Sequence, residues 1–243
     1  MDNLVKIERD LFIQSAKIDS LKLSLSREED YYIGLRDAFD DAFNQYARRE
    51  KKHYAADKDD FMEPVVKQLY KYFTTDSTDF DKCFKKCIEL SKNILNNNRH
   101  GIAQKFVNMS FKYLYCYGDV SKYEHKFTEC HLPLDKYTIK WVKSLKVKEI
   151  NSELKNIDDA WSNLDEKLYE NIQKTVIDKL NSGVDYRISY NPNANNNGIY
   201  KLPKNRLETE FIVWHQEKLN ELHKVLSNTT LEDFERLGIS KIF

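Results

Sequence analysis

Residues 101–117 read Gly-Ile-Ala-Gln-Lys-Phe-Val-Asn-Met-Ser-Phe-Lys-Tyr-Leu-Tyr-Cys-Tyr, and they are apolar or aromatic on almost every side when wound into a helix. A helix of this kind belongs inside a protein. One narrow polar stripe breaks the pattern, because Lys105, Asn108 and Lys112 fall on one line at the 3.6-residue period, with Gln104 beside them. A buried helix that carries two lysines needs an anionic partner or a cleft, so function is sought along this stripe first.

The composition is that of a folded protein, since 41% of the 243 residues are hydrophobic and 32% are charged. Six Gly and four Pro are few for this length, which favours helices over a many-turned β fold. We therefore predict an all-α protein in which residues 101–117 form a central buried helix. The chain is expected to be a single globular unit over residues 1–243. Within it, residues 1–95 with the C-terminal helices, and residues 96–180, would form two helical lobes around a cleft.

Local signals place several of the other helices. Ser26-Arg-Glu-Glu29 matches a capping box and predicts a helix start. Pro64 is expected in the first turn of the following helix, where its missing N–H costs nothing. Asp135 predicts another helix start. The last long helix is expected over residues 206–226, after an irregular loop at 181–205.

The net charge is zero, but residues 81–148 hold 14 Lys and Arg against 6 Asp and Glu. Such an excess can build a phosphate-facing surface on a neutral protein, or it can simply pair with the acidic remainder of the chain. No apolar run approaches the length of a membrane span, and the N-terminus lacks a signal-peptide pattern. These observations predict a cytoplasmic protein with no membrane partner.

The cysteines fit no secreted disulfide framework, which favours reduced thiols inside a cell. Cys83 and Cys87 lie one helical turn apart, and Cys130 with His131 would complete four zinc ligands. However, the chain has no Cys-x-x-Cys pair, and both helical cysteines fall on an apolar face together with core positions. We therefore predict that Cys83 and Cys87 are core thiols, and expect no metal and no cofactor; Cys116 likewise belongs to no disulfide framework.

Two motifs within residues 94–142 point to a known family. Gly101-Ile-Ala-Gln-Lys-Phe-Val107 follows a helix and a short turn, and Leu132-Pro-Leu-Asp-Lys-Tyr-Thr138 begins a later helix. Together they resemble the helix-hairpin-helix DNA glycosylase superfamily. In that family a Gly-hydrophobic-Gly-x-Lys hairpin holds a phosphate through backbone N–H groups, and a Pro-hydrophobic-Asp segment supplies the catalytic aspartate. The resemblance implies Lys105 as the hairpin lysine, the nucleophile of the bifunctional members, and Asp135 as the catalytic carboxylate.

On this resemblance the protein is a DNA glycosylase, with or without AP-lyase activity, that excises a damaged or modified base, for example from phage DNA. Ala103 stands in place of the family's second glycine, and 30 residues separate Lys105 from Asp135, more than the family normally uses. A lysine on an otherwise apolar helix favours its neutral amine, which can attack the sugar C1′. Asp135 would stabilise the positive charge that develops on the sugar.

The same two residues have plain structural interpretations. An aspartate after Leu-Pro-Leu is an ordinary helix N-cap, worth about 1 kcal/mol of stability. A lysine on a buried helix commonly extends its amine to solvent or pairs with a carboxylate. The interpretations are compatible for Asp135, because a capping carboxylate can also face a cleft.

The motifs also define a set of expected DNA contacts. The start of helix 101–117 and its polar stripe would hold phosphates, and the residues concerned are Arg99, His100, Gly101, Gln104, Asn108 and Lys112. Large aromatic side chains would stack on a flipped base, and the candidates are Tyr113, Tyr117, Trp141, Trp161 and Trp214.

Two alternatives remain open. Arg48-Arg-Glu-Lys-Lys-His53 has the Arg-x4-His spacing of HEPN-type ribonucleases, which are all-α dimers that cut RNA by acid–base chemistry. A run of this composition is also typical of a solvated helix end. The other alternative is a DNA-binding module without catalysis, which would use the hairpin and the basic segment for phosphate contacts only.

Overall fold

The computed structural model describes residues 3–16, 23–50, 58–76, 79–95, 99–157, 160–188 and 198–227. It confirms the all-α prediction, because in this part of the chain the only sheet is a two-stranded hairpin. In chain order the elements are α1 (Asn3–Ser15), α2 (Glu29–Glu50), α3 (Lys58–Thr74), α4 (Phe80–Leu95), α5 (His100–Tyr117), α6 (Val120–Thr128), α7 (Lys136–Ser144), α8 (Lys148–Asn156), the 3₁₀ turn η1 (Trp161–Asn163), α9 (Glu166–Ser182), β1 (Asp185–Arg187), β2 (Ile199–Lys201) and α10 (Arg206–Ser227).

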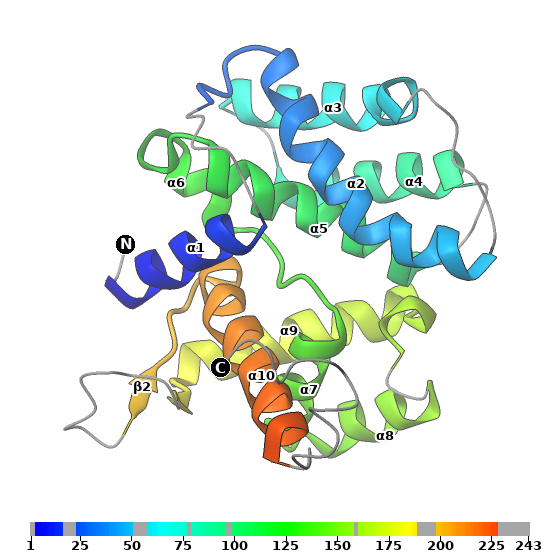
Figure 1. The fold of residues 1–243 in the computed structure, drawn as a ribbon. Coiled ribbons are helices and arrows are strands. Elements are labelled where there is room, and N and C mark those ends of the chain that lie inside the picture. The colour runs from blue at the N-terminus through cyan, green and yellow to red at the C-terminus, as the bar shows by residue number, and fades with distance from the viewer. Residues whose placement is uncertain are drawn as a thin grey trace, which may run out of the picture.

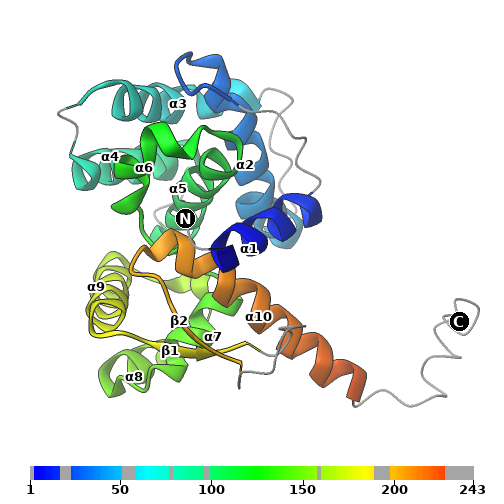
Figure 2. The same cartoon turned by 90° about the vertical axis from the view of Figure 1, so that its left-hand side faces the viewer.

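Helix α5 is the element around which the others pack. Every residue from His100 to Tyr117 is buried except Cys116, which confirms the predicted central helix. Helices α2, α3, α4 and α6 surround α5 in the upper half of the molecule (Figure 1). Helices α7 to α10 form the lower half, and α10 packs against both α7 and α1 (Figures 1 and 2).

Two local predictions are wrong. Pro64 lies inside α3, which begins six residues earlier at Lys58. Asp59 and Asp60 occupy the first turn, where carboxylates favour a helix start, and the lost backbone bond of Pro64 is offset by burial of Val65 and Val66.

The loop predicted at residues 181–205 contains the antiparallel pair β1 and β2, in which Asp185 faces Lys201. Strands of three residues are too short for a period of two to be recognised in the sequence. The predicted last helix over 206–226 is confirmed by α10. Among the described helices, none has the length and apolar character needed to cross a membrane.

The start of α5 is pressed against η1. A Cβ atom on Gly101 would lie 2.1 Å from the carbonyl oxygen of Trp161, which is closer than any real side chain allows. The backbone N–H of Gly101 also donates a hydrogen bond to the carbonyl of Leu164, at 2.9 Å. Glycine is therefore required here so that two backbones can approach each other.

We predict that Gly101→Ala lowers the free energy of unfolding by roughly 1–3 kcal/mol, the usual cost of overpacking a tight site. Gly34→Ala is the matched control, because its new Cβ would lie 3.2 Å from the flexible Leu114 side chain and at an ordinary contact distance, 3.5 Å, from the Leu114 backbone nitrogen. We expect that control to change stability by less than about 1 kcal/mol. Denaturant unfolding of both variants tests this, and a Gly101→Ala protein as stable as the parent would contradict the close approach.

Candidate functional site

Asp135 is the N-cap of α7, and its side chain is fixed from two directions. Its Oδ1 accepts hydrogen bonds from the backbone N–H groups of Tyr137 and Thr138, at 2.9 and 3.0 Å. The Thr138 hydroxyl accepts the Asp135 N–H in return, which completes a capping box. Its Oδ2 accepts a hydrogen bond from Nε1 of Trp214 on α10, at 3.0 Å. The carboxylate is therefore held in one orientation while remaining partly exposed.

A cavity of about 330 Å³ lies beside this carboxylate, between α1, α10 and the first turn of α7. We call it the aromatic cavity, because its walls include the rings of Phe12, Tyr137, Phe211 and Trp214. Two of these wall residues donate hydrogen bonds to Asp135, Tyr137 through its backbone N–H and Trp214 through its indole, and their rings meet edge to face with centres 5.8 Å apart. Asp135 does not itself line the aromatic cavity, but it accepts hydrogen bonds from two residues that do.

Behind the aromatic wall lies a buried ion pair. The amine of Lys112 is 2.9 Å from Oε1 and 2.7 Å from Oε2 of Glu210, and both side chains are only 1% exposed. The same amine lies 3.7 Å from the centre of the Phe12 ring and 5.1 Å from that of Trp214. Burial raises the pKa of Glu210 to about 7, with Asp135 adding to the rise and Lys112 opposing it. The structure therefore brings Lys112, Trp214 and Asp135 of the predicted set into one region.

Sequence reasoning missed Glu210, although a signal for it exists. Leu207, Phe211 and Trp214 mark the apolar face of α10, and Glu210 falls on that same face at helical spacing. A carboxylate at such a position must be paired or functional. The sequence could thus have indicated a buried acid, but not that its partner is Lys112.

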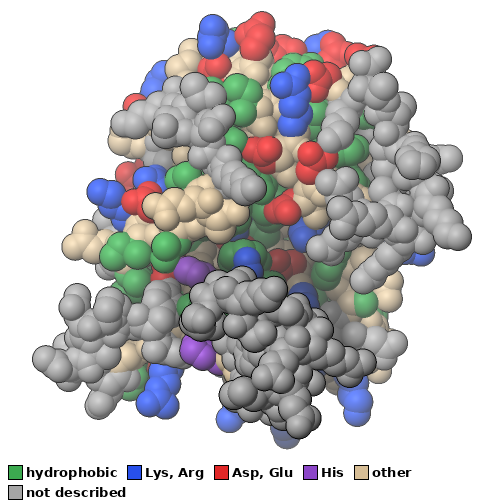
Figure 3. Space-filling view, in the orientation of Figure 1, with side chains coloured by type: hydrophobic (Ala, Val, Ile, Leu, Met, Phe, Trp, Pro, Cys, Tyr) green, Lys and Arg blue, Asp and Glu red, His purple; other side chains and the backbone are tan. Residues whose placement is uncertain are grey.

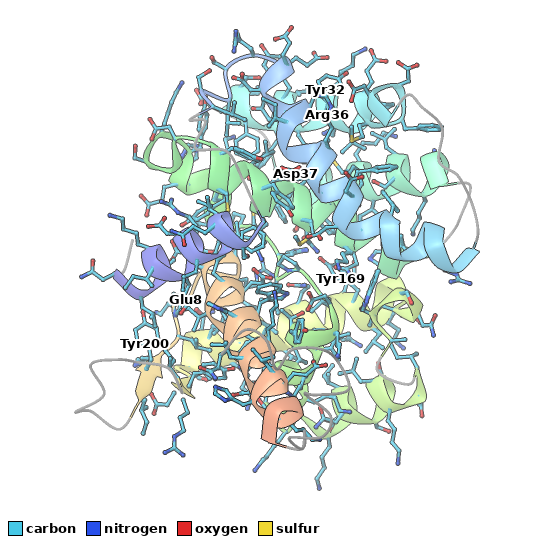
Figure 4. All side chains as sticks on the ribbon, viewed as in Figure 1. Glu8, Tyr32, Arg36, Asp37, Tyr169 and Tyr200 are labelled. Carbon is cyan, nitrogen blue, oxygen red and sulfur yellow. The ribbon has the colours of Figure 1, made fainter. Side chains whose placement is uncertain are left out.

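A second acid, Glu8 of α1, also lines the aromatic cavity, and it too was missed. Its Oε2 lies 2.7 Å from Nδ1 of His215, which lines the same cavity from α10. Burial raises the pKa of Glu8, and His215 opposes that rise. Its Oε1 is buried and has no hydrogen-bond partner among the described residues. Figure 4 shows Glu8 on α1, directed toward α10.

Lys105 lies in different surroundings from Asp135. It is 7% exposed, and its amine sits over the ring of Trp161, 4.9 Å from the ring centre. Within the described part of the chain it forms no hydrogen bond and no ion pair, with Asp135 or with any other residue. Lys105 does not line the aromatic cavity. The two predicted catalytic residues therefore have separate neighbours.

The side-chain amides of the other stripe residues donate hydrogen bonds inside the protein, whereas Oδ1 of Asn108 is buried without a partner among the described residues. Gln104 donates to the carbonyls of Gly101 and Leu134, both at 3.0 Å. Asn108 donates to Gln104 at 3.0 Å and to the Tyr169 hydroxyl at 2.9 Å. The stripe thus faces α9 and the 131–135 segment, which leads into α7. The amide of Gly101, predicted to hold a phosphate, is engaged by Leu164.

Of the predicted base-stacking residues, only Trp214 lines the aromatic cavity. Tyr113 and Tyr117 donate hydrogen bonds toward α2, to Asp41 at 3.2 Å and to Asp37 at 2.6 Å. Trp141 is fully buried in the core, and Trp161 covers Lys105. Arg99, predicted as a phosphate contact, is the exposed N-cap of α5.

The other residues that the sequence suggested for function form no second site among the described residues. His53 and the side chain of Arg48 lie outside the described residues. Cys83, Cys87 and Cys130 are buried, and burial raises the pKa of the Cys87 and Cys130 thiols. In the described ranges, no group of three or more His, Cys, Asp or Glu is arranged to hold a metal ion. On the face seen in Figure 3, acidic and basic side chains are intermixed, and acidic ones gather near its centre.

Comparison with known proteins found no matching family model, no matching curated protein and no matching solved structure.

His100 gives a pH-dependent prediction. Its ring is 6% exposed, and burial, aided by the charge of Lys92, lowers its pKa to about 4. The unfolded imidazole takes up a proton near pH 6.5, whereas the folded one does so only near pH 4, so acid stabilises the unfolded chain in that window. We expect the difference in unfolding free energy, parent minus His100→Phe, to fall by about 3 kcal/mol between pH 7.5 and pH 4.

Denaturant unfolding of the parent and His100→Phe at several pH values measures this difference, in which other titrating groups cancel. The difference should be flat above pH 7.5. A difference that does not change between pH 7.5 and pH 4 would show that the His100 pKa is not lowered by the fold.

Proposed function

We propose that the protein removes a base from DNA by hydrolysing the N-glycosidic bond. The aromatic cavity would receive the extruded base, and Asp135 would be the catalytic carboxylate. One observation carries the proposal: a carboxylate fixed by the start of α7 accepts hydrogen bonds from Tyr137 and Trp214, two residues in the wall of an aromatic cavity. An extruded base needs such a stacking pocket.

The chemistry fits a carboxylate that is held rigidly in place. As the bond between C1′ and the base nitrogen breaks, its electron pair leaves with the base, which takes up a proton, and the sugar becomes cationic. Asp135 would stabilise this cation and orient the water whose oxygen bonds to C1′ and which releases a proton. Its position is fixed before the reaction by the α7 amides and the Trp214 indole, so no reorganisation is needed.

The size and polarity of the cavity support a single base as its occupant. A volume of about 330 Å³ is at the lower end of ligand pockets. The apolar rings would stack on the faces of the base, and Glu8 and His215 would read its edge. The Glu8 Oε1, which has no partner among the described residues, would accept a hydrogen bond from an exocyclic amine or ring N–H.

Lys105 is assigned a supporting role in this proposal. Its amine lies over Trp161, whereas Asp135 is hydrogen-bonded to two residues of the cavity wall, and this separation favours water over lysine as the group that attacks C1′. The proposed enzyme is therefore monofunctional, and Lys105 would add positive charge near the bound strand. The basic excess of residues 81–148 supports DNA as the partner.

We predict that Asp135→Asn lowers single-turnover base excision by roughly 10²–10³-fold, as loss of a charge-stabilising group does. Asparagine caps helices as well as aspartate does, so this variant should fold. Lys105→Gln is the matched control, and we expect it to excise the base at the parent's rate at saturating DNA. Borohydride should trap no covalent adduct with DNA in the parent or in Lys105→Gln. Duplexes carrying a panel of damaged and modified bases are the substrates.

Three outcomes would contradict the proposal. Excision that survives Asp135→Asn would remove the carboxylate from the mechanism. A borohydride adduct lost in Lys105→Gln would show a lysine nucleophile. DNA binding without excision of any base would favour the non-catalytic binding module.

A further inference from the structure

A second cavity, also of about 330 Å³, lies between α4, α9 and the start of α10. We call it the histidine cavity, because His100 and His131 both line it, together with Tyr169 and Arg206. It shares no lining residue with the aromatic cavity. Figure 4 shows Tyr169 on α9 and Glu8 on α1, on either side of α10. The base-excision proposal uses no residue of the histidine cavity.

Arg206 places a buried positive charge in this cavity. The side chain is 8% exposed, and one hydrogen bond, from Nη2 to the carbonyl of Glu129 at 2.9 Å, holds it. No carboxylate of the described residues forms an ion pair with it. Burial lowers the pKa of Arg206, but a guanidinium remains charged at any physiological pH. Burying a cation costs free energy unless an anion pairs with it, and the described residues supply no such anion to Arg206.

A chain of hydrogen bonds fixes the tautomer of His131. The Gln104 amide donates to two carbonyls, which can only accept, so its Oε1 must accept from Asn108. The Asn108 amide also donates to the Tyr169 hydroxyl. The hydroxyl proton of Tyr169 has no other acceptor among the described residues, so it is donated to Nδ1 of His131, at 2.8 Å. The proton of the neutral His131 ring is left on Nε2, which makes Nε2 a donor.

His100 adds a second imidazole, whose ring nitrogens are available for hydrogen bonding to a ligand. Its ring packs against Tyr169 at 5.0 Å, and neither Nδ1 nor Nε2 has a hydrogen-bond partner among the described residues. Buried polar atoms in folded proteins are nearly always satisfied. A ring that is 6% exposed and lines a cavity is satisfied most directly by what the cavity holds.

We propose that the histidine cavity binds a small phosphate-class anion, either inorganic phosphate or the phosphate of a monoester. Arg206 would supply the charge and up to four further N–H donors, and His131 and His100 would each supply one. Arginine and imidazole donors that line one cavity are groups suited to binding phosphate oxygens.

The rim of the cavity favours a small anion over a nucleic acid strand. Lys85, Lys92 and Lys174 stand there with Asp81, Glu89, Glu166 and Glu170, so the charges at the rim nearly balance. Glu170 pairs with Lys85 at 3.5 Å, and Glu89 with Lys86 at 3.1 Å. A rim of mixed sign gives a phosphate backbone little attraction, whereas a small anion can reach the buried guanidinium.

The test is isothermal titration calorimetry of the full chain with three probes. These are inorganic phosphate, a 5′-nucleoside monophosphate, and a single-stranded oligonucleotide without terminal phosphate. We expect the first two to bind, and we expect Arg206→Gln and His100→Phe each to weaken binding at least tenfold. Lys218→Gln, which lines only the aromatic cavity, should bind both like the parent.

The relative affinities identify the source of the anion. Similar affinity for phosphate and the monophosphate supports free phosphate, and a much tighter monophosphate supports a monoester ligand. Binding of the oligonucleotide alone overturns the proposal. It is also overturned if neither small probe binds, or if both bind His100→Phe as they bind the parent. Because His100→Phe keeps the ring contact with Tyr169, it remains informative should Arg206→Gln fail to fold.

Discussion

The ion pair between Lys112 and Glu210 is the constraint on which the rest of the structure depends. Two charges are withdrawn from water, and breaking such a pair by removing one partner costs about 3–5 kcal/mol. The pair can form only when Glu210 of α10 lies within reach of the long Lys112 side chain of α5. That position in turn places Trp214 where its indole reaches Asp135, and places Phe211 and Trp214 opposite Phe12. The aromatic cavity is a consequence of this alignment.

The other polar residues of the α5 stripe position neighbouring elements in the same way. Gln104 holds the segment that ends at Leu134, Asn108 holds Tyr169 of α9, and Lys112 holds Glu210 of α10. Each polar group on a buried helix has to be satisfied, so each one specifies where a neighbouring element must lie. Both cavities are bounded by elements positioned in this way.

Much of this fold follows from local sequence signals, and much of the candidate site does not. The burial of α5, the cap at Asp135 and the extent of α10 are set by periodicity and by residues a few positions apart. The partners of Lys112 and Glu8 lie 98 and 207 residues away in the chain. No helical period encodes such pairs, so the sequence could mark the stripe but not what it meets.

The role of Gly101 illustrates the same limit. A glycine at a helix start is compatible with a phosphate contact and with close backbone approach, and only the position of η1 distinguishes them. The same limit applies to Lys105, because a lysine on an apolar helix indicates an unusual environment but does not identify the residue beside it. Its neighbour is Trp161, from a short turn that carries no periodic signal of its own.

The central claim is that Asp135 faces a sugar that becomes cationic. It is tested most directly by comparing duplexes that carry, at one position, either a cationic pyrrolidine or a neutral tetrahydrofuran in place of the sugar. We predict that the parent binds the pyrrolidine duplex at least tenfold more tightly, as an enzyme binds a mimic of its transition state, and that Asp135→Asn loses this preference. Equal dissociation constants in the parent, or a preference that persists in Asp135→Asn, would contradict the account.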